Sequence, residues 1–236
     1  MHIVVGRRLT EVGAGQLLEL AARHERTIVD LGTGDGRAVI AEAAADPGAL
    51  VIGIDADARA MGDRSRRAAT TPAKGGHPNA VFVASGVELL PADLEGIADR
   101  VTVRFPWGSL LRGAIGVDPP VAASIAGLVR PGGSLELAVS IVERDRLGAR
   151  DASAVEGGEA EPPEFDRLGR PFDAADVERI RAVFEGLGLR LAGVEPMSRT
   201  AVTAYGSSWA RRLRVGLDRP ASLVRLARDP ARGSTA

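Results

Sequence analysis

The 236-residue chain contains no cysteine, which excludes disulfide bonds and metal sites built on thiolates. Its three histidines, His2, His24 and His77, are too far apart in the sequence for the spacing of a zinc site. We therefore expect neither a structural nor a catalytic metal.

Long apolar runs are also missing. The first residues, MHIVVGRR, are apolar over only a few positions before two arginines, which fits neither a signal peptide nor a membrane helix. We expect a cytoplasmic protein without a membrane partner, and we expect it to be a monomer.

Lysine is almost absent, since Lys74 is the only one and arginine supplies the remaining basic residues. The formal net charge is -1, but residues 199–236 hold eight arginines and two aspartates, a charge of +6 that leaves -7 on residues 1–198. A GC-rich genome would explain arginine in place of lysine, but not its clustering. The basic end on an acidic body indicates an anionic partner.

The pattern of apolar segments predicts an α/β fold. At this length the chain can bury one sizeable core, so we expect a single domain over residues 1–236. Buried strands alternate with helical patterns, which is typical of a mostly parallel sheet covered on both faces. The last strand comes late enough to be inserted antiparallel. The seven strands are TIVDLG, LVIGID, NAVFVA, DRVTVRF, SLELAVSIV, LRLAGVEPM and ASLVRLA.

Other segments are placed around this sheet. Residues 1–12 are predicted to form an N-terminal hairpin, and Asp57 and Asp173 each to cap a helix. An RPGG turn is expected before the fifth strand. Residues 151–172 form an acidic segment that we interpret as a mobile loop or insertion. Residues 198–219 connect the last two strands and carry the second tryptophan.

The motif IVDLGTGDG is typical of a cofactor loop. It begins within the first strand, which ends in Asp30, and the following Gly32, Gly34 and Gly36 allow the backbone to turn tightly and lie against a ligand. Nicotinamide dinucleotides favour G-x-G-x-x-G and would bring a pyrophosphate beside Asp30. S-adenosylmethionine instead carries a sulfonium and an ammonium group, which Asp30 would attract. The spacing and the charge favour S-adenosylmethionine over a dinucleotide or a purely structural turn.

Two further carboxylates follow neighbouring strands. Asp55, before Ala56 at the end of the second strand, is placed to accept hydrogen bonds from both ribose hydroxyls of a nucleoside cofactor. Glu88 follows the third strand and could hold either the amino-acid end or the adenine end of the cofactor. An unrelated surface position is the alternative for Glu88.

The two tryptophans predict a surface for a flat substrate. Trp107 follows a strand in the segment FPWG, where Pro106 and Gly108 break the strand and turn the ring towards its exit. We favour a substrate-facing ring there over a core position. Trp209 lies among arginines in GSSWARRLR, a pattern that combines base stacking with phosphate binding. Together the rings could hold one base between them.

With these residues in place, the chain resembles the aminoglycoside-resistance 16S rRNA methyltransferases of the KamB type, which methylate N1 of adenine 1408. The matching segments are VVGRR, DLGTGDGR, IDAD, PAKGG.PN, PWGSLLRG and SSWARRL...DR, and they extend over nearly the whole chain. The resemblance implies a Rossmann-like class I methyltransferase fold, S-adenosylmethionine as cofactor with S-adenosylhomocysteine as product, and 16S rRNA in the 30S subunit as substrate.

The same resemblance implies roles for individual residues. Trp107 and Trp209 would stack on the flipped base, and Arg212 and Arg219 would contact the target nucleotide or its phosphates. The cofactor would be bound by Asp30, Gly32, Gly34, Gly36, Asp55, Ala56, Glu88, Pro106 and Ser207. RNA would be bound by Arg7, Arg8, Arg64, Arg66, Arg67 and Arg211.

The expected chemistry is methyl transfer without a general base. N1 of neutral adenine has a lone pair in the ring plane, so no proton must leave before attack, and none of the histidines is placed to act as a base. Three alternatives stay open: a tRNA guanine-N7 methyltransferase, a protein of this fold that binds RNA without turnover, and a small-molecule methyltransferase, which would leave the basic end without a purpose.

Overall fold

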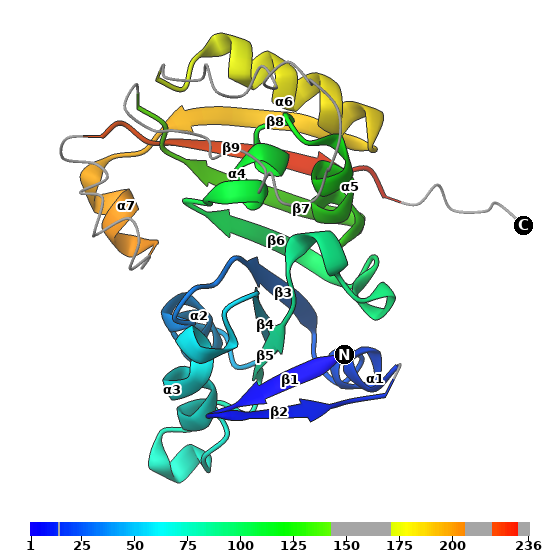
Figure 1. Ribbon diagram of the computed structural model, residues 1–236, viewed down its shortest axis with the longest axis vertical. Helices are drawn as coiled ribbons and strands as arrows, with labels where there is room; N and C mark the ends of the chain where they lie inside the picture. The colour runs from blue at the N-terminus through cyan, green and yellow to red at the C-terminus, as the bar shows by residue number, and fades with distance from the viewer. Residues whose placement is uncertain (14, 143–170, 206–218, 231–236) are drawn as a thin grey trace, which may run out of the picture.

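The structure is a computed structural model that describes residues 1–13, 15–142, 171–205 and 219–230 (Figure 1). The described strands form a single mixed sheet in the order β2-β1-β5-β4-β3-β6-β7-β9-β8. They are β1 (His2–Val5), β2 (Arg8–Glu11), β3 (Arg26–Leu31), β4 (Ala49–Asp55), β5 (Ala80–Ala84), β6 (Ala98–Arg104), β7 (Val129–Val139), β8 (Leu189–Pro196) and β9 (Ser222–Arg228). The helices are α1 (Gln16–Ala21), α2 (Arg37–Ala45), α3 (Ala58–Ala68), α4 (Gly108–Ala114), α5 (Pro119–Gly127), α6 (Ala174–Gly186) and α7 (Arg199–Ala204), with 3-10 turns η1 (Pro72–Lys74), η2 (Val87–Leu89) and η3 (Ala92–Leu94).

The centre of the sheet is parallel. Strands β5, β4, β3, β6 and β7 run in one direction, and β9 is antiparallel to both of its neighbours, β7 and β8. The predicted seven-stranded, mostly parallel sheet with an antiparallel last strand is therefore confirmed. The N-terminal hairpin extends this sheet, because β1 also pairs with β5 at Ile3 and Val83. The sequence predicts the hairpin but not its attachment to the sheet edge.

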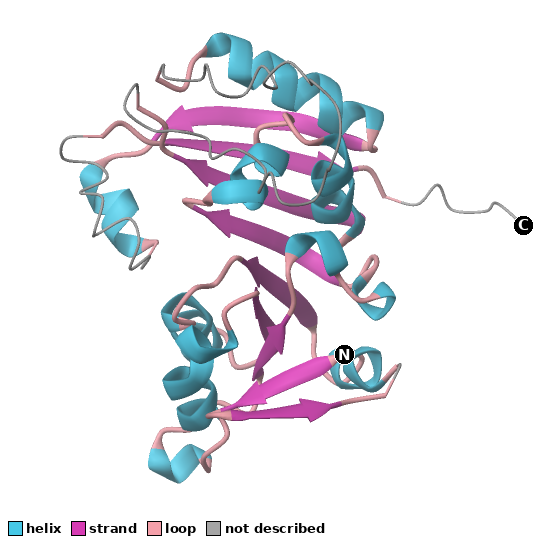
Figure 2. Cartoon of the chain, in the orientation of Figure 1, coloured by secondary structure: helices cyan, strands magenta, loops and turns pink. Residues whose placement is uncertain are grey.

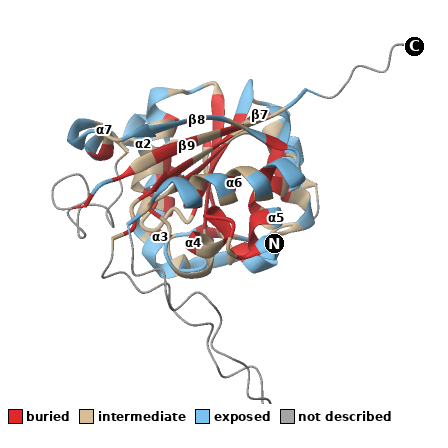
Figure 3. Cartoon of the chain, turned by 90° about the horizontal axis from the view of Figure 1, so that it is seen from above, coloured by how far each residue is buried: buried red, intermediate tan, exposed pale blue. Residues whose placement is uncertain are grey.

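Helices cover both faces of the sheet (Figure 2). Successive side chains of a strand point to opposite faces, so Ile52 of β4 packs in the cluster completed by α1, α4, α5 and α6, whereas Val51 packs against α2 and α3. A smaller third cluster joins Phe105 to Val202 of α7. The buried strands lie between helices whose outer faces are exposed (Figure 3).

Side-chain caps fix the starts of α3 and α6. Asp57 accepts hydrogen bonds from the backbone N–H groups of Arg59 and Ala60, at 3.0 and 3.2 Å. Asp173 and Asp176 form a reciprocal capping box at the start of α6. Both predicted caps are confirmed, and each satisfies backbone donors that a helix end otherwise leaves unpaired.

Two local predictions are corrected. The RPGG segment is part of strand β7 instead of a turn before it, and the register with β6 shifts between Ala98 and Arg100. Gly133 allows this bulge, because an added Cβ would lie 2.9 Å from the carbonyl oxygen of Ala98. Helices α4 and α7 are also absent from the sequence prediction, since both are short and have no amphipathic repeat long enough to detect.

Some predicted segments lie partly outside the described residues. The acidic segment is described only at Pro171 and Phe172, and the connection over residues 198–219 only up to Tyr205 and at Arg219. Within the ranges given above, no helix combines the length and the apolar character needed to cross a bilayer.

Candidate cofactor and substrate site

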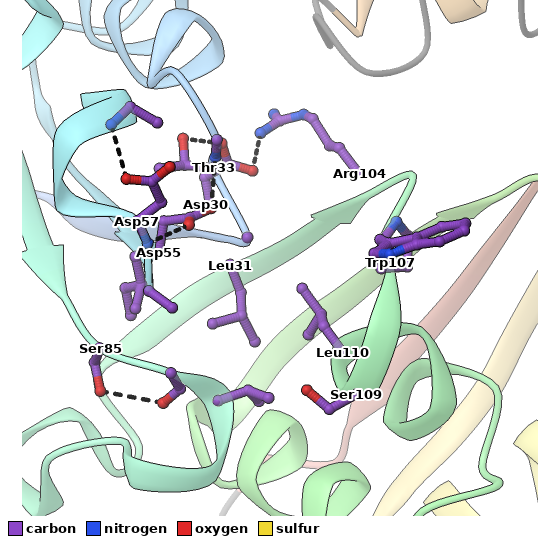
Figure 4. Close-up of a pocket in the computed structure, with 18 of the residues that line it drawn as sticks. Asp30, Leu31, Thr33, Asp55, Asp57, Ser85, Arg104, Trp107, Ser109 and Leu110 are labelled. Atoms are coloured by element: carbon purple, nitrogen blue, oxygen red, sulfur yellow. Dashed lines mark hydrogen bonds and ion pairs between the residues drawn. The ribbon is translucent and has the colours of Figure 1, made fainter. Parts of the chain in front are cut away.

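A cavity of about 620 Å³ opens at the carboxyl ends of β3, β4, β5 and β6 (Figure 4). This is the edge where open parallel sheets bind ligands. Its lining residues come from the glycine loop after β3, the ends of β4 and β5, the corner after β6 and the first turn of α4. The predicted cofactor residues among them are Asp30, Gly32, Gly34, Asp55, Ala56, Glu88 and Pro106.

The three glycines of the loop have different surroundings. All three have positive φ angles, 75° at Gly32, 60° at Gly34 and 72° at Gly36. A Cβ on Gly34 would meet nothing within 4 Å, so the ligand side of the loop is open there. A Cβ on Gly36 would lie 2.4 Å from the ring of Phe82. Gly36 is not among the described cavity residues, and its position explains close packing of α2 on the sheet better than ligand contact.

Asp30 is almost fully buried, and both of its carboxylate oxygens have partners. Oδ2 accepts a hydrogen bond from Thr33 Oγ1 at 2.7 Å, and Oδ1 accepts one from Thr102 Oγ1 at 3.1 Å and forms an ion pair with Arg104. The sequence interpretation does not include the positive charge of Arg104. In the structure Asp30 ties the glycine loop to β6, and its direct attraction of an ammonium group stays a prediction.

Asp55 lines the cavity at the end of β4. Its two oxygens accept the backbone N–H groups of Gly34 at 2.7 Å and Asp57 at 2.8 Å. Burial raises the pKa of Asp55, these two N–H groups oppose that shift, and the charges of Asp57 and Asp30 reinforce it. Each oxygen keeps a lone pair that can accept a hydroxyl, so the pair of oxygens matches the two hydroxyls of a ribose.

The opposite wall of the cavity is formed by the turn after β5. Glu88 is exposed at the rim, and the hydroxyl of Ser85 donates to the carbonyl oxygens of Gly86 at 3.1 Å and Leu89 at 2.9 Å. These bonds hold the η2 turn that carries Glu88. The contact of the Glu88 carboxylate with one end of the cofactor stays a prediction.

Trp107 lies at the mouth of the cavity. Its side chain is 53 % exposed and lines the cavity, which excludes a core position. Phe105 before it has a φ of 51°, a left-handed conformation that bulky residues rarely adopt, and Trp107 itself is the N-cap residue of α4. The corner therefore projects the indole outward, and its stacking on a base stays a prediction.

The comparison with known families agrees with this site. A family model described as NpmA: 16S rRNA (adenine(1408)-N(1))-methyltransferase matches residues 2–227. The chain belongs to this family.

Individual members are similar over nearly their whole length. The 16S rRNA (adenine(1408)-N(1))-methyltransferase of Streptoalloteichus tenebrarius is 34% identical, with 93% of this chain and 94% of the relative covered, and that of Escherichia coli is 29% identical with the same coverage. The crystal structure of 16S rRNA methyltransferase KamB matches with a TM-score of 0.77, 32% identity and 98% and 100% of the two chains covered. The crystal structure of a tryptophan-to-alanine mutant of the Catenulisporales acidiphilia enzyme, with cosubstrate SAM, also matches. Its TM-score is 0.79 and its identity 31%, with complete coverage of both chains.

The described arginines that are predicted to bind RNA lie outside the cavity lining. Arg66 and Arg67 are exposed on α3 and Arg64 is half-buried there, while Arg7 and Arg8 are exposed on the hairpin. The Gly6 N–H donates to Ser65 Oγ at 3.0 Å, which attaches the hairpin turn to α3. The arginines of the hairpin therefore lie next to the arginines of α3. Arg66 pairs with Asp63 at 3.0 Å, but the pair is highly exposed and leaves Arg66 available to an anion.

Of the other predicted site residues, the structure describes only Arg219. Arg219 is 3 % exposed and donates to the Ser140 carbonyl oxygen at 3.1 Å, and its contact with the target nucleotide stays a prediction. Four other predicted residues, Ser207, Trp209, Arg211 and Arg212, lie outside the described part of the chain.

Sequence reasoning missed the polar row under the glycine loop. Thr102 pairs in register with Asp30, and Arg104 follows two residues later on the same face of β6. Two polar residues at alternate positions of a buried strand were the available signal. Ser109 and Leu110 of α4 also line the cavity, and they were missed because that helix was not predicted. Among the described residues, no cluster of three or more histidines and carboxylates has the arrangement of a metal site.

Proposed function

We propose that this protein transfers the methyl group of S-adenosylmethionine to N1 of adenine 1408 in the 16S rRNA of the 30S subunit, and so protects the ribosome from aminoglycosides. The observation that carries the proposal is the family match over residues 2–227 together with an exposed indole, Trp107, at the mouth of a nucleoside-sized cavity. We further propose that it acts as a cytoplasmic monomer and needs no metal.

The described residues of the cavity fit the cofactor. Asp55 would bind the ribose hydroxyls, the backbone of Gly32 and Gly34 would lie against the nucleoside, and Glu88 would bind an amino group at one end. Arg104 neutralises Asp30, but Asp55, Asp57 and Glu88 also line the cavity and give it a negative charge. A cationic ligand with sulfonium and ammonium groups suits such a cavity, whereas a pyrophosphate does not.

The cofactor, when bound, supplies an electrophilic methyl group. N1 of adenine offers a lone pair without prior loss of a proton, so the protein must align two reactants and need not supply a base. The described residues that line the cavity include no histidine, cysteine or lysine, which is consistent with that chemistry. The protein's contribution is to hold the base rigidly in line with the methyl group.

Holding the base requires extruding it from the helical stack of rRNA. That step costs a few kcal/mol, while one aromatic side chain returns about 1–3 kcal/mol by stacking. A single ring barely offsets the cost, so we propose that Trp107 and Trp209 stack on the two faces of the flipped adenine. The exposure of Trp107 supports its half of this arrangement.

Methyl transfer to isolated substrates tests the proposal. Purified protein is incubated with tritium-labelled S-adenosylmethionine and either 30S subunits or bulk tRNA. We expect label in 16S rRNA, and none in tRNA. Label in tRNA alone would identify a tRNA methyltransferase, and label in neither, with RNA binding retained, would identify a binding protein without turnover.

A further inference from the structure

The corner that carries Trp107 is strained, and the ring of Tyr205 packs against it beside the aliphatic residues of the third cluster and the bond from the Phe105 N–H to the Ala138 carbonyl oxygen. Phe105 is the only non-glycine residue with a positive φ angle in the described part of the chain, at 51°. Such a conformation persists in a bulky residue only where the surrounding structure holds it. The supporting contacts of Phe105 therefore decide where the following Pro106 and Trp107 point.

The ring of Tyr205 contacts both residues that lead into this corner. Its centroid lies 6.5 Å from that of Phe105, with the ring planes at 70°, an edge-to-face arrangement. It also lies 5.6 Å from Cζ of Arg104, within the range of a cation–π contact. One aromatic side chain thus packs against two consecutive residues, Arg104 and Phe105.

Tyr205 is itself attached to the sheet. Its hydroxyl donates to Glu136 Oε2 at 3.2 Å, and the Glu136 carboxylate lies 3.7 Å from Arg225 of β9. Tyr205 is the C-cap residue of α7, whose Val202 is buried in the same cluster as Phe105. The ring is therefore fixed by strands β7 and β9 and by α7, none of which includes the corner.

We propose that Tyr205 is a positioning residue for methyl transfer, because its ring holds the Arg104–Phe105 corner and thereby sets the direction of Trp107 at the cavity mouth. Tyr205 is not among the described cavity residues, so it acts through Trp107 and not on the substrate. The proposal rests on the proposed function only in assigning Trp107 to the base. Tyr205 also precedes Trp209 by four positions in the sequence.

Tyr205→Leu and Tyr205→Phe separate the ring from the hydroxyl. Leu removes both ring contacts, whereas Phe keeps the ring and loses only the bond to Glu136. Val202→Ala is the matched control, because it removes packing from the same cluster and leaves the tyrosine ring in place. Melting temperatures of all variants show how much of any effect is lost stability.

The first measurement is steady-state methylation of 30S subunits with S-adenosylhomocysteine affinity measured by calorimetry. We expect Tyr205→Leu to lower kcat/KM for 30S subunits by about tenfold or more with little change in cofactor affinity. Tyr205→Phe and Val202→Ala should stay close to the wild type. Equal losses in Tyr205→Phe and Tyr205→Leu would overturn the role of the ring, as would wild-type kinetics in Tyr205→Leu.

The second measurement needs no RNA. In a Trp209→Phe background Trp107 is the only tryptophan, so acrylamide quenching reports its exposure directly. We expect Tyr205→Leu to shift the quenching constant and the emission maximum away from the values shared by Tyr205→Phe and Val202→Ala. Identical values in all three overturn the proposal. If the wild type does not methylate 30S subunits, the proposed function fails, and the fluorescence comparison still decides the role of Tyr205.

Discussion

The guanidinium group of Arg104 forms an ion pair with the carboxylate of Asp30 in the wall of the cofactor cavity. The two side chains are only 12 % and 3 % exposed. Breaking a buried pair leaves one charge without compensation, which costs more than the pair contributes when intact. This pair therefore fixes the glycine loop on β3 to the end of β6, and through it the cavity to the Trp107 corner.

Asp30→Asn is expected to destabilise the protein. The substitution leaves the buried guanidinium of Arg104 with less compensation, so the free energy of unfolding should fall by about 3–5 kcal/mol. Removing both charges in Asp30→Asn, Arg104→Met should recover part of the loss. Denaturant unfolding measures both, with Glu178→Gln on the exposed side of α6 as the control that changes little. A larger loss in the double variant than in Asp30→Asn would contradict the pairing.

Asp55 should make cofactor binding sensitive to acid. Burial raises its pKa, so folding stabilises the neutral carboxyl relative to the unfolded chain; that contribution to stability is present below the unfolded pKa and is lost as pH rises through the folded pKa. A bound ribose needs the ionised form. Affinity for S-adenosylhomocysteine should therefore fall on acidification at a higher pH than an ordinary aspartate would give.

The matching variant is Asp55→Asn, which removes the titrating group. Calorimetry at several pH values should show weaker binding with a flatter pH profile, while exposed Asp63→Asn should keep the wild-type profile. An unchanged affinity in Asp55→Asn would exclude Asp55 from the cofactor site.

Trp107→Ala should abolish most methyl transfer and leave cofactor affinity nearly intact. Loss of one stacking contact of about 1–3 kcal/mol corresponds to a fall of roughly 5- to 150-fold in kcat/KM for 30S subunits. Trp107→Phe, which keeps a flat ring, should lose much less. The comparison of kcat/KM with the S-adenosylhomocysteine dissociation constant checks this, and full activity of Trp107→Ala would refute base stacking.

The sequence predicts the parts of this site that depend on local pattern. The glycine loop, Asp55 at the end of a strand and the exit of Trp107 from β6 all follow from the order of strands and from Pro106 and the glycines. The Asp30–Arg104 pair could not be predicted with the same ease, because it depends on the register between β3 and β6. The burial of Arg219 depends likewise on tertiary contact with Ser140, which no local pattern shows.

Docking on rRNA should depend on salt through the arginines of α3 and the hairpin. The logarithm of 30S affinity should fall linearly with the logarithm of salt concentration, and Arg67→Gln should reduce the slope by about one if Arg67 meets a phosphate. Arg181→Gln is the control, since Arg181 lies on α6 and pairs with Glu178 and Glu185. Equal slopes for the wild type and Arg67→Gln would place α3 outside the docking surface.

Tyr205 provides an optical probe because it is the only tyrosine. Burial, with the charge of Glu136 next, raises its pKa to about 12, against about 10 in an unfolded chain. The contribution of the neutral phenol to stability is therefore present below about pH 10 and is lost as pH rises through the folded pKa. Tyrosinate absorbance should titrate late in the native protein and earlier in Glu136→Gln; a native midpoint near 10 would contradict the Glu136 contact.

Primer extension on 16S rRNA tests the central claim most directly. A methyl group on N1 blocks base pairing, so reverse transcription of rRNA from cells that express the protein should stop at adenine 1408. The stop should be lost with Trp107→Ala, and the cells should lose aminoglycoside resistance with it. Read-through at adenine 1408 in cells that express the folded wild-type protein would contradict the account.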